Sequence, residues 1–310
     1  MSEVLAWSIF GGIVLILLVL DLGVFHRKAH EVKMREALIW SAVWIAVASL
    51  FNLGIYWLKG KEPAMQFLAG YILEKSLSVD NLFVFLLVFK YFHLPGRFQH
   101  KILFWGILGA LVTRGIFIAL GLEAIRHFHW IIYVFGVILI WTGVKLVSQK
   151  DQKVDPEKNI FLKGFRKIMR ITELYDEEGR FFIRKNGFLF ATPLIAVLIV
   201  IETTDVVFAV DSIPAILSIS RDPFIVYTSN VFAILGLRAL YFALAGLMRL
   251  FHHLHYGLSL ILVLIGFKML LSHFYHIPTA WTLGTILFIL VLSVIASIVW
   301  PLKSEEFTNG

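Results

Sequence analysis

The feature that most constrains this chain is its series of apolar stretches, each close to the length that crosses a lipid bilayer. A transmembrane helix needs about 20 predominantly apolar residues. Residues 281–300, WTLGTILFILVLSVIASIVW, contain no charged side chain at all. Hydrophobic residues make up 59% of the 310 residues and charged residues 16%, against about 45–50% and about 25% in soluble domains. The sequence therefore predicts an integral membrane protein.

The apolar stretches predict an all-α, polytopic fold. They are long and lack the period-two alternation that a membrane β-barrel requires. The first stretch is too long for the apolar core of a signal peptide, so we interpret it as a span. We expect about nine spans, at residues 4–25, 36–58, 64–92, 99–122, 125–147, 187–219, 224–248, 254–273 and 279–301.

The distribution of Lys and Arg predicts the orientation of these spans. If the N-terminus lies outside, 20 basic residues fall on the inner side and four on the outer side. Inner loops of membrane proteins carry such an excess of Lys and Arg. We therefore expect the N-terminus outside and the C-terminus in the cytoplasm. Because the basic residues border apolar stretches, the net charge of +7 indicates topology rather than nucleic-acid binding.

An internal repeat is visible in the middle of the chain. EKSLSVDNLF at residues 74–83 matches DVVFAVDSIP at 205–214, since in each an acid is followed, after four intervening residues, by Val-Asp. Further along, ILGALVTRGIFIALG at 107–121 resembles AILGLRALYFALAG at 233–246. Spans 3–5 and 6–8 are thus expected to be copies, and three spans per copy give them opposite orientations. Inverted repeats of this kind are typical of secondary transporters.

The repeat divides the chain into five segments. They are residues 1–62 with spans 1 and 2, 63–148 with repeat 1, the cytoplasmic loop 149–186, 187–274 with repeat 2, and 275–310 with span 9 and the tail. In the loop, FLKGFRKIMRI has the pattern of an amphipathic helix on the inner membrane surface. ELYDEEGRFFIRKNG then predicts a turn or hairpin, and a disordered tether is the alternative.

Ionisable residues inside the spans are the strongest functional signal. A carboxylate deep in a bilayer costs about 2.5–3.5 kcal/mol on insertion scales. The acids outnumber the bases, and either protonation or a bound divalent cation would balance the excess. The acids are Asp21, Glu74, Asp80, Glu202, Asp205 and Asp211, and the bases are Lys75, Arg114, Arg238 and, nearer a span end, Lys268.

Helix geometry prevents one straight helix from directing all these acids at one ion. Glu202 and Asp205 share a face, but Asp211 lies about 180° away at 3.6 residues per turn. Either the helices break near Thr203–Thr204 and Ser76–Ser78, or some acids act as gates or proton carriers. Carboxylate, amide and hydroxyl oxygens suit Mg²⁺, Ca²⁺ and Mn²⁺, and the amides of Asn81 and Asn230 are candidates for the same shell.

Structural interpretations compete with these functional ones. The acids are alternatively a salt-bridge network with Lys75, Arg114 and Arg238, and Asp21 alternatively pairs with the basic residues of FHRK. HHLH at 252–255 lies beside Arg249 at a predicted boundary, which favours an interfacial role over a metal site.

The motifs EKSLSVDNLFVF, ETTDVVFAVDSIPAI and TSNVFAILGLRALYF resemble those of the TerC family of bacterial membrane proteins. The resemblance extends through nearly the whole chain, from DLGVFHRKAH to GFKMLLSHFYHIP. It implies a multi-pass protein of the bacterial inner membrane that exports Mn²⁺, with the acids as the metal path. The expected metal residues are Glu74, Asp80, Asn81, Glu202, Asp205 and Asp211, and the charge-compensating residues are Lys75, Arg114 and Arg238.

The function predicted first is therefore an Mn²⁺ exporter coupled to protons, without an organic cofactor and without enzymatic activity. The alternatives are Ca²⁺/H⁺ exchange and a membrane scaffold or stress protein that transports nothing. A two-aspartate intramembrane protease is less favoured, because the GxGD motif of such enzymes is absent. The expected partners are the cation, protons and the lipid bilayer, and the sequence leaves the oligomeric state open.

Overall fold

The structure is a computed structural model built almost entirely of helices. It describes residues 3–25, 34–148, 156, 159–172, 175–185, 187–247, 253–272, 274–275 and 277–299, without the side chains of residues 21–25, 80 and 245–247. The predictions for Asp21, Asp80 and His252 therefore concern side chains that the structure does not describe. The helices are α1 Glu3–Phe25, α2 Met34–Lys59, α3 Lys61–Tyr91, α4 Gly96–His127, α5 Ile131–Ser148, α6 Ile160–Ile168, α7 Pro193–Leu217, α8 Pro223–Leu235, α9 Leu237–Leu247, α10 Leu254–Leu271 and α11 Thr279–Val299.

Six helices of the described residues are long and apolar enough to cross a membrane, or seven if the bent pair α8 and α9 is one span. The all-α, polytopic prediction is confirmed, but the count of about nine spans is not. Helix α3 contains several charged residues along its length. The apolar part of α5, Ile131–Val147, is shorter than the other spans.

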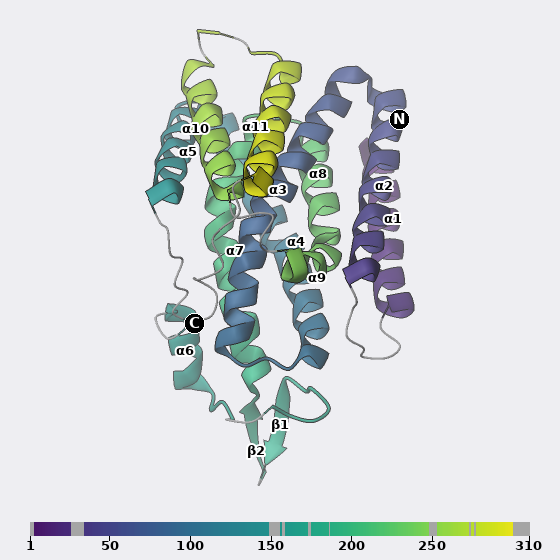
Figure 1. The fold of residues 1–310 in the computed structure, drawn as a ribbon, viewed down its shortest axis with the longest axis vertical. Helices are drawn as coiled ribbons and strands as arrows, with labels where there is room; N and C mark the ends of the chain where they lie inside the picture. Colours follow the sequence, from purple (N-terminus) through teal and green to yellow (C-terminus); the bar gives the residue numbers. More distant parts are fainter. Residues whose placement is uncertain are drawn as a thin grey trace.

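Helices α3, α4, α7 and α8 occupy the centre of the molecule (Figure 1). Helix α3 packs on α8, α4 on α7, and α5 on α10. Helices α5 and α10 flank the centre on one side, and α1 and α2 flank it on the other (Figure 1). The buried apolar side chains of the central helices form two clusters, and Glu74, Arg114 and Asp205 are buried on the same helices.

The predicted start of the sixth span at residue 187 is wrong. Residues before the span form a hairpin in which β1, Phe182–Lys185, pairs antiparallel with β2, Phe188–Ala191. Gly187 has φ +79°, a left-handed conformation that suits glycine at a tight turn. Helix α7 begins only at Pro193, a position that favours proline because its missing N–H has no helical partner there.

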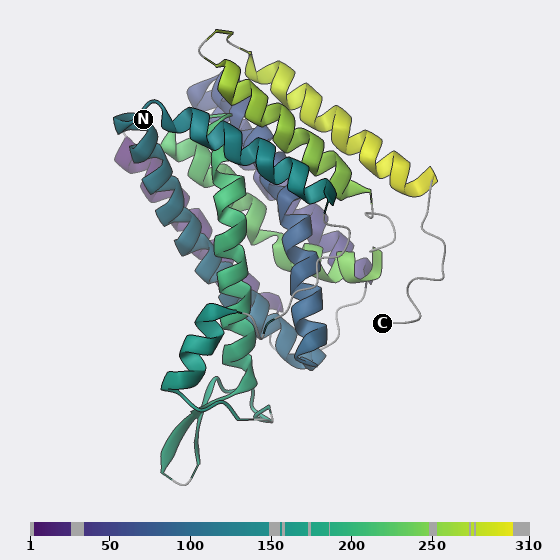
Figure 2. The same ribbon diagram turned by 90° about the vertical axis from the view of Figure 1, so that its left-hand side faces the viewer.

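The hairpin and α6 project from one end of the helical body (Figure 2). The segment between α6 and β1 attaches them to the α3–α4 end, because the Tyr175 hydroxyl donates to the Phe92 carbonyl at 2.7 Å and Lys101 Nζ donates to the Gly179 carbonyl at 2.7 Å. Burial raises the pKa of Tyr175 to about 12, so its hydroxyl keeps its proton at neutral pH. Helix α6 forms where the amphipathic pattern predicts a helix, with Asn159 as its N-cap.

The helix breaks proposed near Thr203–Thr204 and Ser76–Ser78 are wrong, because α3 and α7 are continuous there. The hydroxyls of Ser76, Thr203 and Thr204 instead donate to carbonyls four residues back, as Thr204 does to Val200 at 2.6 Å. Such bonds satisfy hydroxyls inside an intact helix. The break lies at Gly236, where α8 and α9 meet at 42°.

Candidate functional site

Arg114 of α4 is the centre of a buried ionic network. Its side chain is 1% exposed, and it forms ion pairs with Glu74 of α3 and Asp205 of α7. Arg114 donates from Nη2 to Asp205 Oδ1 at 3.0 Å and from Nε to Oδ2 at 3.4 Å. A two-pronged contact of this kind fixes the planar guanidinium on the carboxylate. The network thus joins one acid from each predicted repeat through a single base.

Polar side chains complete the network. Ser78 Oγ donates to Glu74 Oε1 at 3.3 Å, and Asn230 Nδ2 of α8 donates to Glu74 Oε2 at 3.0 Å. In the described part of the chain, the Asn230 Oδ1 atom is buried and accepts no hydrogen bond. Buried acceptors nearly always have a partner. An oxygen left open beside a carboxylate is a position that a cation or a water molecule would satisfy.

Lys75 contacts the backbone rather than the predicted carboxylates. Its Nζ donates to the Ala233 carbonyl at 3.2 Å, near the C-terminal end of α8. A cation is favourable there because the last carbonyls of a helix carry partial negative charge. A Cβ atom on Gly236 would lie 2.6 Å from the Lys75 Nζ, so the helix break leaves space for this ammonium group. Arg238 is also buried, two residues past the break.

Glu202 lies one turn before Asp205 on α7 and faces a glycine. A Cβ added at Gly109 of α4 would collide with the Glu202 carboxylate. The side chain is half-buried, and no hydrogen bond or ion pair joins it to any side chain that the structure describes. The absence of a side chain at position 109 therefore leaves room for a carboxylate within a membrane-spanning helix pair.

Asp211 occupies a third place, on the opposite face of α7. Thr142 of α5 donates to Asp211 Oδ1 at 2.7 Å. The two residues border a cavity of about 60 Å³ whose wall also includes Asn81 and Ser212. Asp211 therefore contacts α5 whereas Glu202 faces α4, as expected for residues about 180° apart on an unbroken helix. Thr142 was missed because a single threonine in an apolar stretch gives no signal of its partner.

The predicted metal residues thus separate into three places. Glu74 and Asp205 share Arg114, Glu202 faces Gly109, and Asp211 lies with Asn81 at the small cavity. Among the described residues, which exclude the Asp80 side chain, no three His, Asp or Glu side chains come together to hold a metal ion. A cation that uses the acids of α7 would therefore contact Glu202, Asp205 and Asp211 in sequence rather than all at once.

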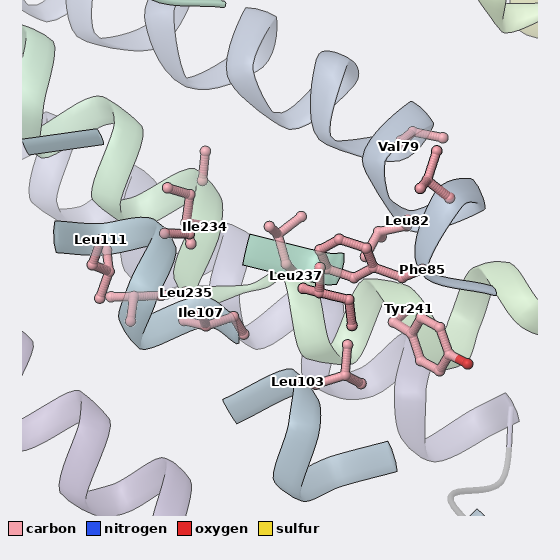
Figure 3. Close-up of a cluster of buried hydrophobic side chains, with 14 of the residues drawn as sticks. Val79, Leu82, Phe85, Leu103, Ile107, Leu111, Ile234, Leu235, Leu237 and Tyr241 are labelled. Carbon is pink, nitrogen blue, oxygen red and sulfur yellow. The ribbon is translucent and has the colours of Figure 1, made fainter. Parts of the chain in front are cut away.

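An apolar cluster lies beyond the network, toward the end of the molecule where α3 connects to α4. Figure 3 shows these side chains meeting from α3, α4, α8 and α9. All are buried, so they seal this side of the network from water. The labelled members are Val79, Leu82, Phe85, Leu103, Ile107, Leu111, Ile234, Leu235, Leu237 and Tyr241.

Comparisons with known proteins identify relatives along almost the whole chain. A family model described as "Integral membrane protein TerC family" matches residues 59–306. The "Uncharacterized membrane protein STKORF319" of Myxococcus xanthus is 47% identical over 293 residues, which cover 94% of this chain and 92% of the relative. The "Putative membrane-bound redox modulator Alx" of Escherichia coli (strain K12) is 47% identical over 300 residues, with 94% and 93% covered.

A more distant relative extends the same result. The "Uncharacterized membrane protein" of Rickettsia felis is 40% identical over 295 residues, which cover 95% of this chain and 98% of the relative. None of these three names is that of an enzyme. No solved structure matches the chain.

Proposed function

This chain is a member of the TerC family of integral membrane proteins, and on that premise we propose that it is a secondary transporter that exports Mn²⁺ in exchange for protons. One observation carries the proposal. Helices α3 and α7 carry four described carboxylates, of which Glu74 and Asp205 are buried and Glu202 and Asp211 are half-buried. Arg114 is the only base with a described ion pair to any of them. Ionisable side chains in membrane spans are costly and mark ion pathways.

The donor atoms support a hard divalent cation as the substrate. Carboxylate, amide and hydroxyl oxygens surround the candidate path, and such ligands favour Mn²⁺, Mg²⁺ or Ca²⁺ over softer metals. The motifs resemble those of Alx, and that resemblance implies export of Mn²⁺. The name of that relative describes it as a redox modulator. The 310 residues contain no cysteine, so a redox effect of this chain would act through its cargo rather than through thiol chemistry.

Glu202 is the proposed site of exchange between metal and protons. A carboxylate without a basic partner in a low-dielectric setting is stabilised either by a proton or by a cation, and the two compete. Glu74 and Asp205 are already neutralised in part by Arg114, so they serve mainly to hold the helices in register. Asp211, with Asn81 and Thr142 nearby, is the proposed next station for the ion.

The pairing of the helices supports the inverted repeat. In the proposed repeat, α3 corresponds to α7, α4 to the pair α8–α9, and α5 to α10. The packing of α3 on α8 is then equivalent to the packing of α7 on α4. Both pairings are present, and α5 packs on its counterpart α10. Inverted repeats place the substrate site where the copies meet, which is where Arg114 bridges Glu74 and Asp205.

The proposed location is the bacterial inner membrane, with the N-terminus outside and the C-terminus in the cytoplasm. The basic α6 and the hairpin gather at the α3–α4 end (Figure 1), and this grouping supports a cytoplasmic face there. A single cysteine in place of Lys163 provides a test, because the chain has no other. Labelling of that cysteine by an impermeant reagent in intact cells would contradict this orientation.

Reconstitution into lipid vesicles tests the proposed activity. The vesicles contain only this chain as protein, and Mn²⁺ is added on one side. Mn²⁺ flux across the membrane should accelerate when a proton gradient drives protons in the opposite direction. Flux of Ca²⁺ in preference to Mn²⁺ would favour the alternative Ca²⁺/H⁺ exchange. The complete absence of metal flux from correctly folded protein would overturn the transporter proposal and favour a scaffold role.

A further inference from the structure

A polar cavity opens at the end of the molecule opposite the hairpin. Its volume is about 540 Å³, and it lies where α3 and α11 begin and where α7 and α10 end. Three charged side chains line it: Glu62, Arg221 and Lys268. Serine side chains and Gln66 add further polar groups, with Ser220 Oγ donating to Gln66 Oε1 at 2.6 Å. The cavity is therefore suited to a polar or charged ligand.

An apolar groove continues from this cavity between α10 and α11. Its volume is about 170 Å³, and its walls include Leu264, Ile265 and Ile289. The two helices lie side by side (Figure 2). Lys268 and Ile277 line both spaces, so the groove and the cavity meet at the Lys268 side chain.

The charges at this junction favour an anionic group. Two bases face one acid, and the acid is engaged because Thr279 Oγ1 donates to Glu62 Oε1. Lys268 Nζ donates to Thr282 Oγ1 at 3.0 Å, which leaves two of its three N–H groups. Within the described residues, the Arg221 guanidinium makes no hydrogen bond or ion pair. The same excess of positive charge disfavours a metal cation here.

We propose that the cavity and the groove together form a binding site for one phospholipid. Its phosphate binds Lys268 and Arg221, and one acyl chain fills the groove between α10 and α11. Trp281 on the rim of the groove is 74% exposed, as befits an aromatic side chain at the bilayer interface. A free phosphate ion would use the bases but not the groove. A headgroup ammonium, as in phosphatidylethanolamine, would also find Glu62 as a partner.

Such a lipid would join parts of the chain that are far apart in sequence. Glu62 lies in the first turn of α3, Arg221 lies between α7 and α8, and Lys268 lies near the end of α10. The phospholipid would thus brace this end of the protein against the membrane, independently of any cation path through the centre.

Native mass spectrometry of the full chain in detergent tests the site, with dioleoyl-phosphatidylethanolamine as the probe. One lipid should stay bound to the unaltered protein. The double change Arg221→Gln and Lys268→Gln should weaken its retention at least tenfold. Arg126→Gln removes an equally positive but exposed side chain at the same end, and should leave retention unchanged.

Two further variants distinguish a bound phospholipid from a bound anion. Thr285 lines the groove, so Thr285→Trp should fill it and reduce lipid retention, whereas Lys268→Arg keeps the charge and should retain the lipid. Wild-type retention by the double variant or by Thr285→Trp would overturn the proposal. So would displacement of the lipid by millimolar inorganic phosphate, which would identify a simple anion site.

Discussion

Replacing Arg114 with leucine removes the base that two buried carboxylates share. The side chains of Arg114 and Glu74 are 1% exposed, and that of Asp205 is 6% exposed. Removing one partner of a buried ion pair typically costs about 3–5 kcal/mol. If both acids instead take up protons at pH 7, each costs about 4 kcal/mol, since ordinary carboxyl pKa values lie near 4.

The expected loss in the free energy of unfolding is therefore roughly 3–8 kcal/mol. That is comparable with the whole stability of many proteins, about 5–15 kcal/mol. Arg114→Leu should consequently give little folded protein at pH 7. The difference in stability and yield from the unaltered protein should be smaller at pH 5, where protonating an ordinary carboxyl group costs only about 1 kcal/mol. Thermal unfolding in detergent and the yield of monodisperse protein measure both effects.

A compensated variant provides the control. Glu74→Gln and Asp205→Asn remove the two negative charges, so adding both to Arg114→Leu leaves an uncharged network. A neutral replacement of a buried ionic triad is often tolerated, and the triple variant should recover most of the folded yield. If Arg114→Leu alone is as stable as the unaltered protein, or if the triple variant is no better than the single one, the network does not act as described.

Three further predictions concern neighbouring groups. Gly109→Ala should displace the Glu202 carboxylate and reduce Mn²⁺ flux severalfold, while the free energy of unfolding changes by less than about 1 kcal/mol because alanine favours helices. Thr142→Val keeps the shape but removes the hydrogen bond to Asp211, and should cost about 1–3 kcal/mol of stability. Gly187→Ala should destabilise the hairpin by about 1–2 kcal/mol through its left-handed backbone, which increased proteolysis of the loop would report, and it should leave flux unchanged.

Each of these three predictions has a result that would contradict it. Gly284→Ala is the control for Gly109→Ala, because a Cβ there meets nothing within 4 Å; equal flux in the two alanine variants would contradict the role of the glycine. Unaltered thermal stability of Thr142→Val would show that its hydroxyl does not hold Asp211. Loss of flux in Gly187→Ala would show that the hairpin takes part in transport.

Much of the helical architecture was predictable from apolar length and from the positions of charged residues. The face shared by Glu202 and Asp205, and the opposite direction of Asp211, follow from helical geometry alone. Strand β2 of the hairpin, residues 188–191, resembles the start of a span in the sequence because its side chains are as apolar as those of the helix that follows. Composition cannot separate the two, whereas strand pairing and the proline at residue 193 do.

Side-chain partners were less predictable. Counting charges indicates that acids exceed bases, but it does not indicate which base meets which acid, since that depends on how the helices rotate against one another. Arg114 contacts two acids, and Lys75 turns to a backbone carbonyl instead. The break at Gly236 is equally hard to predict, because the groups packed against this glycine, the Lys75 ammonium and the Trp44 side chain, come from distant parts of the sequence.

The central claim is that Glu202 and Asp211, the two carboxylates on α7 without an ion pair among the described residues, carry the cation. The initial rate of Mn²⁺ flux per folded molecule, in vesicles that contain only this chain, tests it most directly. Glu202→Gln and Asp211→Asn remove one negative charge each, and Glu123→Gln removes one from the exposed end of α4. Flux should fall at least tenfold in the first two variants and should be unchanged in the third. Wild-type flux in both Glu202→Gln and Asp211→Asn would contradict it.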